Sequence, residues 1–527
     1  MQIHLTHPTR LNRRHQTFRQ HNLADIEKRV SVSTINSISR GNVSKTVGIR
    51  YAFGRSVFSN ILGEFGVQTV RIGGFIVLAR VLEPKDFGIL RVLIAISMAA
   101  TMLITLGIPE ALIQREDLSE YHESTAWWIS LVAATGSGLL LYWGAPLLAW
   151  AMAMPPLISF VRLIALPVVL SGTTAVANAR LRRQFKFAAL ATSEVTAEIA
   201  FVSTALLLLG LHQNRWCLAG GLAARISVQA AVVWVAEGYL PIHWPSRAAA
   251  RDIIGFCATV CSGRLLVVLA GNADYLMVGR LLGASALGFY SMAWDLLRFV
   301  SDRLYAVAGR VTLPAFCRLQ QDGETLAAIY QGFIGLISRI ILPLMACAVV
   351  AAPKLLVGIY GPQWIPAAVP MRLLSGGLAL AGLRMAIGSI YYAKGRPSFD
   401  VYVHLLRLAL IITGIGLLAR TGLVGVSLGM GMVEASVSIF GQLLVCALTG
   451  IGLVRIGAAM MPGMKLAAVC AIATFVGEFI ATFCHIPGPL LLLVIATPPA
   501  IVFCTIEFSS VWTLAAATFY GQPASAN

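Results

Sequence analysis

A succession of apolar runs of 18 residues or more fills this chain from about residue 56 onward. A helix rises about 1.5 Å per residue, so about 20 apolar residues cross the hydrocarbon core of a bilayer. The sequence therefore predicts about fourteen transmembrane helices, joined by connections too short for a soluble catalytic domain. They lie near 56–79, 87–107, 125–148, 156–178, 188–211, 217–240, 253–279, 285–309, 328–352, 367–392, 399–419, 422–447, 464–484 and 488–510.

The overall composition supports an all-α integral membrane protein. Only 12% of the residues are charged and 57% are hydrophobic, whereas about a quarter of the residues of a soluble protein are charged. The net charge of +17 is concentrated in short loops and in the N-terminal tail. This distribution is typical of membrane insertion and argues against nucleic-acid binding.

A repeat at an offset of 200 residues divides the chain into two halves. The stretch Arg71–Leu90 resembles Gly271–Tyr290, and Gly88 corresponds to Gly288. Such a repeat indicates a doubled fold, with two pseudo-symmetric bundles around a central cavity. We expect a basic, disordered tail over 1–50, bundles of about six spans over 51–250 and 251–450, and two additional spans with a short tail over 451–527.

The loop charges predict an orientation. With the N-terminus inside, the inner loops carry thirteen basic residues and the opposite loops carry six. Because cytoplasmic loops are rich in Lys and Arg, both termini are expected to be cytoplasmic, which requires an even number of spans. The tail has no apolar core of the signal-peptide type.

Several function classes lack their characteristic residues. The sequence contains no phosphate-binding loop for ATP hydrolysis. The nine cysteines are scattered, mostly inside apolar runs, and the histidines are dispersed, so we predict no metal site and no cofactor. No arrangement of nucleophile and base can be argued either, which predicts that the chain is not an enzyme.

Ionisable residues inside the apolar runs are the candidate functional residues, because each is costly in lipid unless it has a partner or faces water. We predict a substrate-binding set consisting of Glu64, Arg71, Arg264, Asp274, Asp295, Arg298 and Arg303. Arginine exceeds carboxylate in the spans as a whole, which indicates a cavity that attracts an anion, and the planar guanidinium suits phosphate. A single arginine can instead pair or reach the interface, and this is the expectation for Arg162, Arg339 and Arg407.

Glu194 and Glu198 lie four residues apart in one predicted span, so they share a helical face. Two carboxylates in a low dielectric can share a proton, which makes the pair a candidate ion-coupling site. The alternative is that both are interface charges opposite the basic stretch Arg180–Lys186.

Four segments resemble one family. Ala79–Gly88 is similar to the first-loop signature of Wzx-type polysaccharide transporters, in the multidrug/oligosaccharidyl-lipid/polysaccharide flippase superfamily. Asn272–Tyr290 resembles the seventh-span motif of that family, and Leu313–Gln320 and Tyr360–Trp364 resemble later segments. The resemblance covers roughly residues 50–450, and the basic tail departs from it.

The resemblance implies two bundles that open alternately to each side of the bacterial inner membrane. The expected cargo is an undecaprenyl-diphosphate-linked oligosaccharide, moved to the periplasmic leaflet for exopolysaccharide or lipopolysaccharide synthesis. Partners would be membrane lipid, the polysaccharide polymerase and the chain-length machinery. Arg80 and Arg280 lie at span ends, where they would cap helix C-termini or anchor headgroups.

Three other functions remain open. A drug or cation antiporter of the same superfamily would need a cavity dominated by carboxylates, whereas this one is rich in arginine. A polysaccharide polymerase or ligase would need a large external loop, and the longest external connection, near Pro353–Pro366, has only about a dozen residues. A channel would need a repeated pore or filter motif, which the sequence lacks.

Overall fold

The computed structural model describes residues 63–484 except 106 and 116, together with 497 and 499–501. All regular secondary structure in these residues is helical, which confirms the predicted fold class. The predicted tail over 1–50 lies outside the described residues, as does nearly all of the last predicted span, 488–510.

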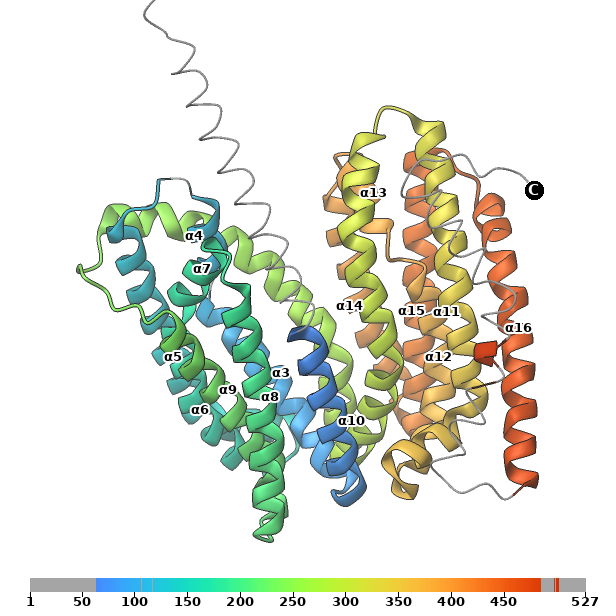
Figure 1. Cartoon of the computed structure of the whole chain (residues 1–527), viewed down its shortest axis with the longest axis horizontal. Coiled ribbons are helices and arrows are strands. Elements are labelled where there is room, and N and C mark those ends of the chain that lie inside the picture. The colour runs from blue at the N-terminus through green and yellow to red at the C-terminus, as the bar shows by residue number, and fades with distance from the viewer. Residues whose placement is uncertain (1–62, 106, 116, 485–496, 498, 502–527) are drawn as a thin grey trace, which may run out of the picture.

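The helices form two lobes that lie side by side and diverge toward one end, the top in Figure 1. The N-lobe consists of a helix over 63–81, α3 (Pro84–Thr105), α4 (Ile108–Gln114), α5 (Glu120–Met152), α6 (Leu157–Thr173), α7 (Ala175–Arg183), α8 (Phe187–Gly210), η1 (Asn214–Trp216) and α9 (Cys217–Ala236). The helix α10 (Arg247–Arg318) runs from the N-lobe into the C-lobe. The rest of the C-lobe consists of α11 (Gly323–Tyr360), η2 (Pro362–Ala367), α12 (Ala368–Gly382), α13 (Ile387–Ala393), α14 (Ser398–Leu418), η3 (Ala419–Thr421), α15 (Gly422–Thr449) and α16 (Leu453–Phe483).

The helix α10 contains two of the predicted spans, 253–279 and 285–309, joined without a loop. At Gly283 the backbone has φ +87°, inside a helix that otherwise runs for 72 residues. A side chain at this φ would be strained, so glycine allows the chain to reverse within one residue. In Figure 1, α10 descends from the N-lobe to the bottom and rises again in the C-lobe.

The predicted count of fourteen spans is not confirmed. Among the described residues, nine helices are long and apolar enough to cross a membrane, or ten if the bent pair α6 and α7 forms one span. Part of the difference arises because consecutive helices merge. The continuous stretch Ser398–Thr449, for example, holds two predicted spans, 399–419 and 422–447.

The two copies of the sequence repeat pack against each other where the lobes meet. A Cβ on Gly88 would overlap the carbonyl oxygen of Ala284, and a Cβ on Gly288 would overlap the carbonyl oxygen of Pro84. Each glycine thus contacts the residue four positions before its counterpart. This reciprocity is what a two-fold relation between the halves requires, and it explains why both positions are glycine.

Polar contacts close the same end of the molecule. Arg80 of the N-lobe donates from Nε to the carbonyl of Ile359 (3.0 Å) and from Nη2 to that of Gly358. In return, Gln363 and Trp364 donate side-chain N–H groups to the carbonyl of Ala79, at 2.7 and 2.8 Å. The prediction that Arg80 caps a helix C-terminus is confirmed, since its acceptors are the last carbonyls of α11.

Basic connections gather at the diverging end. Arg115, after α4, pairs with Asp252 at 2.9 Å, and Lys186, after α7, pairs with Glu237 at 3.0 Å. In the C-lobe, Lys394 after α13 donates to the carbonyl of Gln320 at 3.0 Å. Figure 1 places α4, α7 and α13 toward this end.

Candidate functional site

A buried glutamate in the N-lobe holds two arginines from neighbouring helices. Glu198 of α8 accepts from Arg71 of the helix 63–81, at 3.1 Å from Nε and 2.5 Å from Nη2. Arg225 of α9 lies 3.1 Å from the same carboxylate oxygen. The glutamate side chain is 3% exposed, whereas Arg71 and Arg225 are 38% and 33% exposed. We call these three residues the N-lobe triad.

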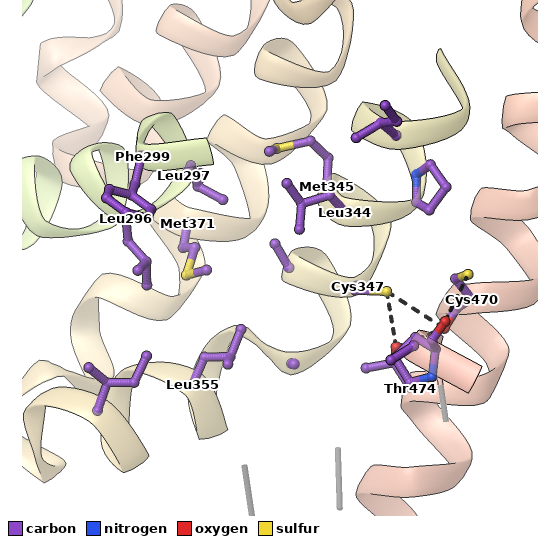
Figure 2. A pocket seen from close by; sticks show the side chains of 17 residues that line it. Leu296, Leu297, Phe299, Leu344, Met345, Cys347, Leu355, Met371, Cys470 and Thr474 are labelled. Carbon is purple, nitrogen blue, oxygen red and sulfur yellow. Dashed lines mark hydrogen bonds between the residues drawn. The ribbon is translucent and has the colours of Figure 1, made fainter. Parts of the chain in front are cut away.

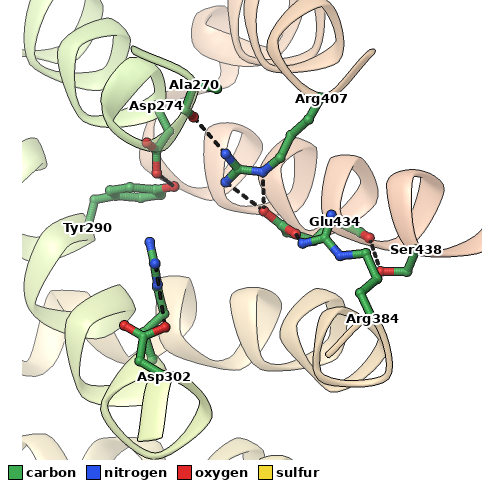
Figure 3. A network of polar contacts seen from close by, with 9 residues as sticks. Ala270, Asp274, Tyr290, Asp302, Arg384, Arg407, Glu434 and Ser438 are labelled. Carbon is green, nitrogen blue, oxygen red and sulfur yellow. Dashed lines mark hydrogen bonds and ion pairs between the residues drawn. The ribbon is translucent and has the colours of Figure 1, made fainter. Parts of the chain in front are cut away.

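The C-lobe has the same arrangement on other helices. Glu434 of α15 accepts from Arg407 of α14 through Nε and Nη2, at 2.9 and 2.8 Å. Its second oxygen accepts from Arg384, which follows α12, at 2.6 Å. Glu434 is 2% exposed, and Arg384 and Arg407 are 21% and 11% exposed. Figure 3 shows this C-lobe triad, with the guanidinium of Arg407 also donating to the carbonyl of Ala270.

Asp274, which was predicted to bind substrate, is fully buried in this structure. Its Oδ2 atom accepts from the hydroxyl of Tyr290 at 3.0 Å, as Figure 3 shows. The role of Asp274 in substrate binding stays a prediction. Arg298, on the same helix α10, points toward Asp302 at 3.5 Å and retains about a third of its side-chain exposure.

In the described part of the chain, ion pairs link helices of the N-lobe to the part of α10 that follows Gly283. Arg303 of α10 pairs with Glu64 of the helix 63–81, and Arg91 of α3 lies 3.5 Å from Asp295 of α10. Arg91 also stacks over the ring of Tyr275, 3.8 Å from its centroid. These four charged residues connect the walls of the two lobes.

The structure changes the expectation of an unpaired cationic cavity. Arg71, Arg298 and Arg303 each have a carboxylate partner, and the side chain of Arg264 lies outside the described residues. The local excess of arginine resides in the triads, where two guanidinium groups share one buried carboxylate. A guanidinium has five N–H donors, and Arg71 uses two of them on Glu198. Each triad can therefore still present donors and net positive charge to a ligand.

The two carboxylates predicted to couple ion movement meet different partners. Glu198 turns to Arg71 and Arg225, whereas Glu194, one helical turn earlier, is exposed. In this structure the partners of Glu198 are therefore arginines, and the ion-coupling role of the pair stays a prediction.

Sequence reasoning missed Glu434 and Arg91. Both are single charges inside apolar runs, so the criterion that selected the other candidates could have found them. Their importance was hidden because their partners are distant in sequence: Glu434 lies 27 positions from Arg407 and 50 from Arg384. The expectation that Arg407 is a paired structural arginine is confirmed by its contacts with Glu434.

A separate cavity of about 510 Å³ opens among α10, α11, α12 and α16. Its lining is almost entirely apolar, and Figure 2 shows leucine, methionine and phenylalanine side chains among the residues that line it. Its polar edge is formed by Thr474, whose hydroxyl lies 3.2 Å from Sγ of Cys347. This cavity, which we call the apolar cavity, suits a hydrocarbon ligand. Among the described residues, no group of three His, Cys, Asp or Glu side chains could hold a metal ion.

Comparison with known proteins places this geometry in context. Residues 77–369 match the family described as polysaccharide biosynthesis protein. The chain is 25% identical over 369 residues to the lipopolysaccharide biosynthesis protein WzxC of Escherichia coli K12, a match that covers 68% of this chain and 73% of that protein. It is 24% identical over 311 residues to the teichuronic acid biosynthesis protein TuaB of Bacillus subtilis, covering 58% of this chain and 63% of TuaB.

Solved structures share the fold at low sequence identity. The lipid II flippase MurJ, in an inward closed conformation, superposes with a TM-score of 0.66 at 8% identity, over 86% of this chain and 99% of MurJ. An inward-facing multidrug transporter of the MOP superfamily gives 0.60 at 16% identity, over 73% of this chain and 96% of that chain. The two-lobed helical fold is therefore that of multi-pass membrane transporters.

Proposed function

Because this chain belongs to the polysaccharide biosynthesis protein family, we propose that it is a flippase for lipid-linked oligosaccharides. The cargo would be an oligosaccharide repeat unit on undecaprenyl diphosphate, destined for exopolysaccharide or lipopolysaccharide. The protein would carry it across the bacterial inner membrane by alternating access. This is transport, and it requires no bond to be made or broken by the chain.

The observation that carries the proposal is the pair of triads, one in each lobe. A diphosphate cannot enter hydrocarbon without groups that replace its water, and fixed guanidinium groups can do so. The buried Glu198 and Glu434 hold their arginines in place, so less side-chain entropy is lost when the anion binds. With one triad in each lobe, movement of the lobes can transfer the headgroup while arginine donors remain available.

The charge distribution supports an orientation. The basic connections at the diverging end favour the cytoplasm, which would put both termini there. The end closed by Gly88, Gly288 and Arg80 would then face the periplasm. In this orientation the lobes would diverge toward the cytoplasm, the side on which the substrate is made.

The apolar cavity supports the lipid part of the proposed substrate. An isoprenoid chain has no hydrogen-bonding groups, so it needs only apolar surface and access from the bilayer. The cavity between α11 and α16 offers such a surface. The chain could remain among these helices while the diphosphate crosses between the lobes.

The experiment compares Arg71→Ala, Arg71→Lys and Arg384→Ala in cells that depend on this chain for surface polysaccharide. We expect both alanine variants to lose export at normal membrane abundance. Arg71→Lys should recover only part of it, because an ammonium cannot make the planar two-pronged contact.

The matched control is Arg162→Ala. This arginine also lies within a predicted span, but its Nε donates to the backbone carbonyl of Tyr142 at 3.3 Å. Export should be unchanged in this variant. Normal export from all the triad variants at wild-type abundance would refute the assignment of diphosphate binding to the triads.

A further inference from the structure

We propose that a polar cavity at the closed end of the N-lobe binds a sugar unit of the transported oligosaccharide. This outer cavity has a volume of about 440 Å³ and lies between the start of α3, the start of α6 and η1. Its size falls within the range of about 300–1,000 Å³ typical of small-molecule sites. The proposal rests on the proposed function, because it assigns a site to the saccharide part of that cargo.

The charges of the outer cavity favour a neutral ligand with many hydroxyl groups. Glu83 and Lys85 form an ion pair at 2.5 Å, Asp86 accepts from the backbone N–H of Glu83 at 3.3 Å, and Arg215 lies on the facing wall with Asn214. Two acids and two bases cancel, so a diphosphate gains little here. A sugar hydroxyl can donate to a carboxylate and accept from a cation at once.

An aromatic ring completes the site. Trp216 is half-buried in the wall of the outer cavity and is held edge to face against the buried Phe160, with ring centroids 5.1 Å apart and planes at 89°. A fixed indole provides a flat apolar surface beside polar groups. The C–H face of a pyranose ring matches that surface while its hydroxyls reach the charged side chains.

The internal repeat shows that the fold does not require these charges. The C-lobe copy of Glu83-Pro-Lys-Asp86 is Gly283-Ala-Ser-Ala286. Both copies lie where one helical segment turns into the next, and both contribute to the same seam, through Pro84 in one case and Ala284 in the other. Since the C-lobe copy makes the seam without any charged side chain, the acids and the lysine of the N-lobe copy are available for a ligand.

The position of the outer cavity fits the end of the transport path. Pro84, between Glu83 and Lys85, contacts Gly288 across the seam. The cavity is therefore adjacent to the place where the lobes would part when the transporter opens to this side. A saccharide that emerges there can be held before its lipid anchor has left.

The test uses the full-length protein in a detergent that contains no sugar. The probe is the free oligosaccharide released by mild acid from the lipid-linked repeat unit of the host cell. Saturation-transfer NMR reports which sugar protons touch the protein. We expect contact with the wild type, and an affinity loss of about tenfold or more in Asn214→Ala/Arg215→Ala, because one neutral and one charged hydrogen-bond partner are removed.

The matched control is Arg420→Ala. Arg420 is the exposed arginine of η3, which precedes α15 as η1 precedes α9, so it occupies the corresponding place in the C-lobe. Its loss should leave sugar binding unchanged. Because Asn214 and Arg215 are exposed, the double variant should keep the wild-type unfolding temperature.

Two further measurements distinguish a failure of this proposal from a failure of the proposed function. Undecaprenyl diphosphate without sugar should stabilise the double variant as it stabilises the wild type, while Arg71→Ala should lose that effect and keep sugar contact. If the wild type shows no transfer to the oligosaccharide, or the double variant binds as well as the wild type, the outer cavity is not a sugar site. If undecaprenyl diphosphate fails to stabilise the wild type, it is the proposed function that fails.

Discussion

Replacing Glu434 by Gln tests the energetics of the C-lobe triad most directly. The substitution keeps the shape of the side chain but removes its charge. The amide oxygen can accept from one arginine, while the amide N–H₂ then points at the other guanidinium, which has no acceptor to offer. Breaking a buried ion pair by removing one partner costs about 3–5 kcal/mol, because the remaining charge stays buried.

The structure sets where in that range the cost should fall. Arg407 is 11% exposed and packed against the carbonyl of Ala270, so it cannot turn to water. Arg384 is 21% exposed and can partly rehydrate. We therefore expect a loss of about 3–4 kcal/mol, between a fully buried and a partly hydrated pair. The same substitution at Glu198 should cost less, about 1–3 kcal/mol, because both of its arginines are about a third exposed.

The purified variants are unfolded in the same detergent, and tryptophan fluorescence reports the unfolding. The result is the order of the midpoints of their unfolding transitions. Glu434→Gln should unfold first, Glu198→Gln next and the wild type last. Adding Arg407→Met to Glu434→Gln should recover part of the loss, because it removes the stranded charge, and this non-additivity measures the coupling. A Glu434→Gln variant as stable as Glu198→Gln, or no recovery in the double variant, would refute the reasoning.

Three other predictions concern the seam, the apolar cavity and the basic end. Gly88→Ala should prevent tight closure of the seam and raise the reactivity of nearby engineered cysteines toward an external thiol reagent; Gly73→Ala, with open space around its Cα, should not. Ala348→Phe, which fills the apolar cavity, should slow export of the long-chain undecaprenyl substrate more than that of a short-chain analogue in reconstituted vesicles, and equal slowing would contradict the cavity's role. The hydrogen bond from Arg115 lowers the pKa of Asp252, so the stability contributed by this pair is present above the ordinary carboxyl pKa and is lost as the pH falls through the lowered value. The stability difference between wild type and Asp252→Asn should therefore shrink on acidification, and a difference that grows would show that the pair does not act this way.

Much of the architecture could be predicted from local patterns. Apolar length alone indicates helices that cross a membrane, and the 200-residue repeat predicts the two lobes that the structure shows. Arg80 could be placed at a helix end because its position in the repeat is at the boundary of an apolar run. The number of spans could not be settled in the same way. The reversal at Gly283 occurs within one residue, and hydropathy does not distinguish a sharp reversal from a continuous helix.

The candidate site was only partly predictable. The free-energy cost of a charged side chain in lipid identifies which residues need partners. By this criterion Arg71, Arg298 and Glu198 were selected, and each has a charged partner in the structure. The criterion does not say which partner each one meets. Pairing depends on how helices from distant parts of the chain face one another, and this is why Glu434 was overlooked and why the burial of Asp274 was not foreseen.

By itself, the sequence determined that the chain is a doubled bundle of membrane helices with arginines among them, because hydrophobic length and repetition are properties of the chain read in order. Only the tertiary structure decided that Glu198 and Glu434 each hold two arginines, and that Trp216 lies beside Glu83 and Lys85. These arrangements join side chains that are far apart in sequence. The packing of whole helices brings them together, and no local pattern records that packing.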